Sequence, residues 1–200
     1  MSGRIYLVFT PELCRQDPYQ TLEAALAAGV DLVQWRPRRP SRDGLERTRA
    51  TCRGHQTPLI INDDVMLALR SEAAGAHVGQ DDMPSDAARK LMFGRLLGVS
   101  THDIAQIQLA AKATANYVGF GPCFPTKTKD YDQGVGMEAV AAAVEKCHEL
   151  NMPMFAIGGI TPTNLPELYA QGVRRIAVSS YVLQHDNPAQ AVRELREALP

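Results

Sequence analysis

The chain has 200 residues, of which 45% are hydrophobic and 22% are charged, and its formal net charge is −1. This length suits one domain with a sizeable core, expected over 1–200, and the charge suggests neither a nucleic-acid nor a membrane partner. The four widely spaced cysteines contain no Cys-x-x-Cys, so we expect reduced thiols in a cytoplasmic protein rather than zinc ligands or disulfides.

Short apolar runs alternate with helix-like stretches along the whole chain. Helix starts are expected at Asp17-Pro18, Thr161-Pro162 and Asn187-Pro188, and Gly29 is expected to end the first helix. The expected strands are 5–9, 32–35, 59–61, 76–79, 96–99, 117–120, 154–157 and 175–178.

Near-continuous apolar strands joined through helices indicate parallel pairing with both faces covered. A closed barrel and an open doubly wound sheet both fit that description. Segments 28–34 and 74–80 resemble each other two units apart, which favours a barrel, and no Gly-x-Gly-x-x-Gly follows the first strand. The sequence therefore predicts an α/β fold, a single (β/α)₈ TIM barrel.

In such a barrel the site lies where the strands end, so the residues at these exits carry the functional prediction. After the second strand, Gln34, Arg36 and Arg38 alternate and could share one face. An amide and two guanidinium groups suit a multiply charged oxyanion such as a diphosphate. The alternative is a solvated basic loop, since Arg39 and Arg42 follow closely.

A pair of adjacent aspartates follows the third strand, in Asn62-Asp63-Asp64, and another pair follows the fourth strand, at Asp81-Asp82. Carboxylates on neighbouring strand ends repel each other unless a cation lies between them, and Mg²⁺ prefers such oxygen ligands. Helix capping is the alternative, and it accounts for one aspartate at each exit better than for a pair.

The remaining exits are also polar. Ser100 is either a site hydroxyl or a helix cap, and His102 is interpreted as a surface or capping neighbour. The long stretch 121–136 is either a loop that closes over an anion or a solvated loop. Gly158-Gly159 and Ser179-Ser180 follow the seventh and eighth strands, the usual phosphate site of these barrels, with tight packing as the alternative.

Together the exits predict two anion sites with a metal ion at one of them. Two phosphorylated ligands held face to face indicate group transfer or condensation. A diphosphate bound by Mg²⁺ and arginine is a good leaving group, because the developing charge is stabilised.

Six segments in order, 33–38, 59–63, 77–82, 98–100, 121–129 and 156–160, resemble the thiamine-phosphate synthase family over almost the whole chain. The resemblance implies a Mg²⁺-dependent transferase that joins a hydroxymethylpyrimidine diphosphate to a thiazole phosphate, releasing pyrophosphate. It also implies a dissociative mechanism, in which the diphosphate leaves before the thiazole nitrogen captures the carbocation.

The same resemblance assigns the site residues. The pyrimidine diphosphate would contact Gln34, Arg36, Arg38, Asn62, Ser100 and Lys129, with Ser100 and Lys129 as the catalytic candidates. Mg²⁺ would bind Asp63 and Asp82. The thiazole phosphate would contact Thr126, Lys127, Thr128, Gly158, Gly159, Ser179 and Ser180.

The chain departs from the family pattern in three ways. Arg38 stands where lysine is usual, and Pro37 stiffens the loop that would bind the diphosphate. The stretch 38–58 is about one helical turn short, which predicts a shortened second helix. A sister family that isomerises the thiazole phosphate is an alternative, although it lacks the metal pattern and has histidine in the motif that here reads Gly121-Pro122. A non-catalytic barrel that binds thiamine precursors is another. A homo-oligomer is left open.

Overall fold

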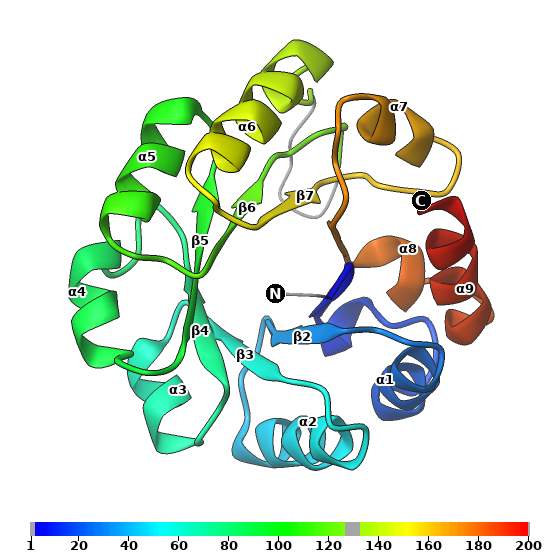
Figure 1. The fold of residues 1–200 in the computed structure, drawn as a ribbon. Coiled ribbons are helices and arrows are strands. Elements are labelled where there is room, and N and C mark those ends of the chain that lie inside the picture. Colours follow the sequence, from blue (N-terminus) through cyan, green and yellow to red (C-terminus); the bar gives the residue numbers. More distant parts are fainter. Residues whose placement is uncertain (1–2, 127–132, 200) are drawn as a thin grey trace.

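The computed structural model describes residues 3–126 and 133–199, and these form a closed barrel of eight parallel strands paired in chain order (Figure 1). The predicted (β/α)₈ barrel is therefore confirmed. The strands are β1 Ile5–Phe9, β2 Leu32–Trp35, β3 Leu59–Asn62, β4 Gly75–Val78, β5 Leu96–Thr101, β6 Tyr117–Phe120, β7 Met154–Ile157 and β8 Ile176–Val178.

Helices surround the barrel, as Figure 1 shows. They are α1 Pro18–Ala27, α2 Arg42–Gly54, α3 Val65–Arg70, α4 Ser85–Leu91, α5 Ile104–Lys112, α6 Met137–Glu149, α7 Leu165–Ala170, α8 Ser180–Leu183 and α9 Pro188–Ala198, with a 3₁₀ turn at Pro11–Leu13. Within the described ranges, none of these helices has both the length and the apolar character needed to cross a bilayer.

Side-chain alternation along the strands divides the core into two layers. Ile5, Leu7 and Phe9 of β1 face the helices and belong to the large outer core. Tyr6 and Val8 of the same strand point inward and join a small central cluster. The inner cluster fills the barrel, and its polar members lie below the pocket described in the next subsection.

Three expectations about local structure are wrong. The helix expected at Thr161-Pro162 begins only at Leu165, because Asn164 closes the preceding turn by accepting a hydrogen bond from the Thr161 N–H and donating one to the Gly159 carbonyl. The second helix is not shortened: α2 has 13 residues, as many as α6.

The third error concerns the resemblance between 28–34 and 74–80. Gly29 ends a helix with φ at +103°, whereas Gly75 is the first residue of β4. A Cβ at Gly75 would lie 2.2 Å from the Leu96 carbonyl oxygen, so this glycine serves close strand packing. The two segments are not structurally equivalent, although the barrel they suggested is present.

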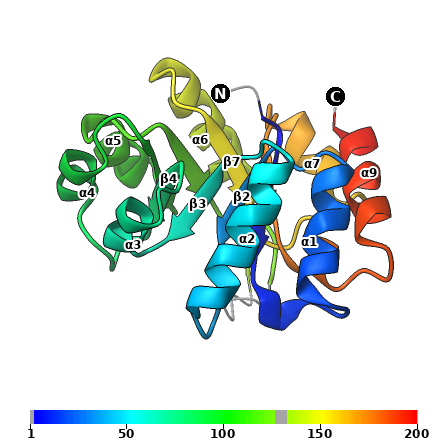
Figure 2. The ribbon, with the colours of Figure 1, turned by 90° about the horizontal axis from the view of Figure 1, so that it is seen from below.

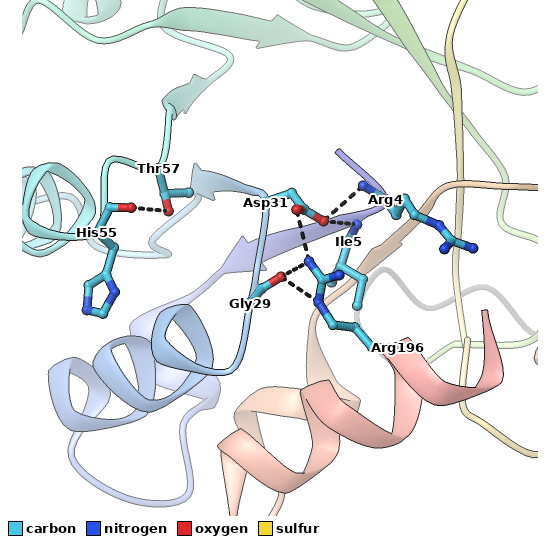
Figure 3. Close-up of polar contacts among 7 residues, drawn as sticks. All are labelled: Arg4, Ile5, Gly29, Asp31, His55, Thr57 and Arg196. Carbon is cyan, nitrogen blue, oxygen red and sulfur yellow. Dashed lines mark hydrogen bonds and ion pairs between the residues drawn. The ribbon is translucent and has the colours of Figure 1, made fainter. Parts of the chain in front are cut away.

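A polar cluster ties the first and last parts of the described chain together at the end of the barrel where the strands begin (Figure 3). The Asp31 carboxylate accepts hydrogen bonds from the Arg4 and Ile5 N–H groups, each at 2.9 Å. Arg196 of α9 pairs with the same carboxylate at 2.9 Å and also donates to the Gly29 carbonyl. Asp31 thus links β1, β2 and α9.

Replacing Asp31 by asparagine should lower the free energy of unfolding by about 1–2 kcal/mol, the lower part of the range for charged hydrogen bonds because its side chain is 28% exposed. Urea unfolding measures the change. Asp186→Asn is the control, since Asp186 pairs with Arg15 but is 75% exposed, and it should change stability by less than about 0.5 kcal/mol. Equal losses in the two variants would contradict a special role for Asp31.

Candidate active site

A pocket opens at the end of the barrel where the strands terminate, and it gathers most of the predicted site residues. Its lining combines strand ends from both halves of the chain. The predicted residues that line it are Gln34, Arg36, Asn62, Ser100, Thr126, Gly158, Gly159, Ser179 and Ser180. Lys127, Thr128 and Lys129 lie outside the described residues.

The exit of β2 places Gln34 and Arg36 in the pocket but not Arg38. Gln34 is buried within β2, and the Arg36 N–H continues the strand by donating to the Phe9 carbonyl at 2.8 Å. Pro37 follows, β2 has already ended at Trp35, and Arg38 is exposed outside the lining. Strand alternation therefore does not extend to Arg38, because β2 has ended and the chain bends at Arg38 and Arg39.

The two aspartates that follow β3, Asp63 and Asp64, have different local roles. Asp64 caps α3 by accepting a hydrogen bond from the Leu67 N–H at 2.8 Å. Asp63 is not the cap: it has φ at +61° and accepts a hydrogen bond from the Asn62 amide at 2.6 Å. Capping thus explains Asp64 and does not explain Asp63.

Asp82 accepts a hydrogen bond from the Gly79 N–H at 2.7 Å, while the N-cap of α4 is Pro84. Neither Asp63 nor Asp82 belongs to the pocket lining. They follow neighbouring strands, and the Asp63 N–H donates to the His77 carbonyl of β4 at 2.8 Å. Across the described ranges, no set of three or more His, Cys, Asp or Glu residues is grouped as a metal site.

The floor of the pocket is a chain of hydrogen bonds inside the barrel. The Gln34 amide donates to the Tyr6 hydroxyl at 2.7 Å, and the Tyr6 and Tyr117 hydroxyls are 2.9 Å apart. The Tyr117 hydroxyl lies 3.3 Å from Nδ1 of His77, whose Nε2 lies 2.9 Å from Oγ of Ser100. Burial raises the pKa of both tyrosines well above the usual value, so both hydroxyls keep their hydrogens.

Sequence reasoning missed Tyr6, His77 and Tyr117, because each stands within an apolar strand and looks like core. The signal that could have identified them is a side chain with a polar group at an inward-facing position of an otherwise apolar strand. Gly98 makes room for them: a Cβ there would lie 2.2 Å from Cζ of Tyr117 and 2.5 Å from Nδ1 of His77. The absence of a side chain at Gly98 therefore leaves room for the Tyr117 and His77 side chains of the pocket floor.

The end of β5 corrects two interpretations. Ser100 lies within β5, and α5 is capped by Asp103, which accepts from the Gln106 N–H at 2.8 Å, so Ser100 is not a helix cap. His102 is exposed, as expected, but it also lines the pocket, and its Nδ1 is hydrogen-bonded to the Gly121 carbonyl.

On the opposite side of the pocket, the glycines after β7 allow close approach of the loop after β6. Gly158 and Gly159 have φ at +103° and +61°. A Cβ would lie 2.7 Å from the Pro122 Cα at the first position and 2.5 Å from the Pro125 oxygen at the second. Tight packing is thus present here, and it forms one wall of the predicted phosphate site.

The serines after β8 also have distinct positions. The Ser179 hydroxyl donates to the Val8 carbonyl at 2.9 Å and so links β8 to β1. Ser180 is the first residue of α8, and both serines line the pocket. The hydroxyl of Ser179 is therefore committed to the barrel wall in this structure.

Comparison with known proteins places the chain in a family. Residues 5–182 match the family described as thiamine monophosphate synthase. A thiamine-phosphate synthase from Mycolicibacterium smegmatis is 36% identical over 209 residues, which cover 98% of this chain and 91% of the relative. One from a Synechococcus species is 42% identical over 90% of this chain, but the chain spans only about half the length, 52%, of that relative.

A solved structure agrees. Thiamine phosphate pyrophosphorylase from Pyrococcus furiosus superposes with a TM-score of 0.86 at 28% identity, covering 98% of this chain and 94% of that one. The family match extends over nearly the whole barrel, including the strand exits that form the pocket. The chain therefore belongs to the thiamine monophosphate synthase family.

Proposed function

We propose that this chain is a thiamine-phosphate synthase, a transferase. It joins 4-amino-2-methyl-5-hydroxymethylpyrimidine diphosphate to 4-methyl-5-(2-phosphoethyl)thiazole and releases pyrophosphate. The observation that carries the proposal is one pocket, in a member of this family, with polar strand exits on two opposite sides. Such a pocket suits two phosphorylated ligands held in one place.

The diphosphate is assigned to the side formed by β2, β3 and β5. Arg36 supplies a forked cationic donor, and Asn62 and Ser100 supply neutral hydrogen-bonding groups in the same lining. These donors stabilise the leaving diphosphate more strongly as negative charge develops on it in the transition state. Such preferential stabilisation lowers the reaction barrier. Lys129, outside the described residues, is retained as a proposed partner of this group.

Asp63 and Asp82 are the proposed Mg²⁺ ligands. Their carboxylates follow adjacent parallel strands at the pocket end of the barrel, and oxygen donors suit this ion. Two protein ligands are enough, because Mg²⁺ usually keeps phosphate oxygens and waters in its remaining positions. When bound, the ion would offset the charge of the departing diphosphate.

The thiazole phosphate is assigned to the side formed by β7 and β8. Gly158 and Gly159 give this wall a backbone turn with positive φ, and Ser180 and Thr126 line the same wall. Holding the thiazole ring there would place its nitrogen close to the pyrimidine methylene carbon. Proximity of the two reactants is the main contribution this chemistry requires.

Pyrophosphate release with both substrates and Mg²⁺ tests the proposal, and thiamine phosphate should form in equal amount. Isomerisation of the thiazole phosphate without coupling would instead support the sister family. Saturable binding of both substrates without turnover would support a non-catalytic binder. Either result would contradict the proposal.

Arg36 and Arg38 offer a matched pair of substitutions. Arg36→Lys should weaken pyrophosphate binding by about tenfold, because lysine loses the forked geometry in the pocket lining. Arg38→Lys should change it by less than about twofold, since Arg38 is exposed outside the lining and keeps its charge. Calorimetric titration with Mg²⁺ present measures both. A large loss at Arg38 alone would show that its forked group reaches the ligand.

A further inference from the structure

The hydrogen bonds on the pocket floor have a direction that can be worked out by counting hydrogens. The Tyr6 hydroxyl already accepts a hydrogen from the Gln34 amide. A neutral histidine ring has one N–H donor and one acceptor nitrogen. Tyr117 is 0% exposed, so an arrangement that leaves its own hydroxyl hydrogen without an acceptor is costly. With that hydrogen used, the contacts from Tyr6 through Tyr117 and His77 to Ser100 can run in either of two directions.

In the first direction, Tyr6 donates to Tyr117 and Tyr117 donates to Nδ1 of His77. The ring then carries its hydrogen on Nε2 and donates to Ser100, whose own hydroxyl hydrogen is left over. In the second direction every bond reverses: Ser100 donates to Nε2, Nδ1–H donates to Tyr117, and the leftover hydrogen is on Tyr6. The two directions differ in which end of the chain has a spare donor.

The surroundings of the two ends favour the first direction. Tyr6 also lines the pocket, but it is only 2% exposed, and its hydroxyl is already hydrogen-bonded to Gln34 and Tyr117. Ser100 is partly exposed at the pocket wall, where water or a ligand can accept its hydrogen. A buried donor without an acceptor is costly, and this cost corresponds to a preference of about tenfold or more for the first direction.

We propose that His77 is a positioning residue: held with its hydrogen on Nε2 by Tyr117, it makes the Ser100 hydroxyl a hydrogen-bond donor to an anionic oxygen in the pocket. That this oxygen belongs to a diphosphate rests on the proposed function, whereas the direction of the chain does not. The hydrogen-bond chain of the pocket floor thereby determines, before any ligand binds, that the Ser100 hydroxyl donates rather than accepts.

The direction can be observed without substrate. In protein labelled with ¹⁵N-histidine, two-bond correlation spectra distinguish the Nε2–H from the Nδ1–H form of each ring. Of the five histidines, the signals of His77 are those that disappear in His77→Gln. We expect the Nε2–H form for His77. The Nδ1–H form, or equal amounts of both, would overturn the proposed direction.

The positioning role is tested with two isosteric replacements. A glutamine amide can reach the place of Nε2 and still donate to Ser100, whereas an asparagine amide reaches only the place of Nδ1. With pyrophosphate and Mg²⁺ as the probe, His77→Gln should stay within about threefold of the unmodified chain, and His77→Asn should bind about tenfold more weakly. Thermal unfolding of each variant checks that the barrel is retained.

The double variant shows whether His77 acts through Ser100. Ser100→Ala should weaken binding about tenfold alone and by less than twofold in the His77→Asn background. Equal losses for both His77 variants, or additive losses with Ser100→Ala, would show a packing role and overturn the proposal. If pyrophosphate does not bind at all, the proposed function fails, and the ¹⁵N measurement still decides the direction of the chain.

Discussion

Replacing Asp63 by asparagine should slow thiamine phosphate formation by about 100-fold or more at limiting Mg²⁺, since even supporting residues of a metal site cost about 10–100-fold. Asparagine keeps the shape and the acceptor oxygen that faces the Asn62 amide, but it removes the charge. Asp63 has φ at +61°, a conformation that asparagine tolerates and alanine does not. Asparagine is therefore the cleaner test. Initial rates measured against Mg²⁺ concentration should show a raised requirement.

Asp64→Asn is the matched control for this substitution. Asp64 caps α3, and asparagine is an equally good N-cap, so both activity and stability should be nearly unchanged. If the two neighbouring variants lose activity equally, the effect comes from the general charge of the loop. If Asp63→Asn remains fully active at low Mg²⁺, Asp63 does not bind the metal.

Gly158→Ala should lower the free energy of unfolding by about 2–5 kcal/mol, from backbone strain and overpacking together. The strain arises because φ is +103° at this position, a value that alanine rarely adopts. The overpacking arises because the new Cβ would lie 2.7 Å from the Pro122 Cα, which is backbone and cannot rotate away. Urea unfolding measures the loss.

Gly94→Ala separates the two causes. Gly94 also has a positive φ, +76°, but a Cβ added there would meet no described atom within 4 Å, so only the strain of about 1–2 kcal/mol should appear. The difference between the two variants reports the clash with the loop after β6. Equal losses would show that this loop moves aside at little cost.

The fold was predictable because most strands are short apolar runs bounded by turn residues. Strand ends were less certain where polar residues continue a strand, as at Asn62 in β3 and at Ser100 and Thr101 in β5. Hydrophobic pattern cannot detect these residues, because their place in the strand depends on pairing with a neighbouring strand. The late start of α7 has a similar cause, since Asn164 makes tertiary contacts that propensity does not include.

The site was partly predictable because a barrel brings all strand exits to one end. That rule placed Gln34, Asn62 and Ser100 in one pocket although they are distant in sequence. It could not place Arg38, where the chain bends and the next residue, Arg39, donates its N–H to Glu12, and it gave no reason to select His77 or Tyr117. A buried hydrogen-bond chain becomes visible only when side chains from several strands are placed together.

The Asp31–Arg196 cluster lies at the end of the barrel opposite the pocket, and Figure 2 shows the first strand and α9 reaching that same side. An affinity or fluorescent tag joined next to Gly3 or Leu199 would therefore leave the mouth open to incoming substrates. A second enzyme fused at either position would stand back to back with this barrel, so its product would have to diffuse around the outside to enter the pocket.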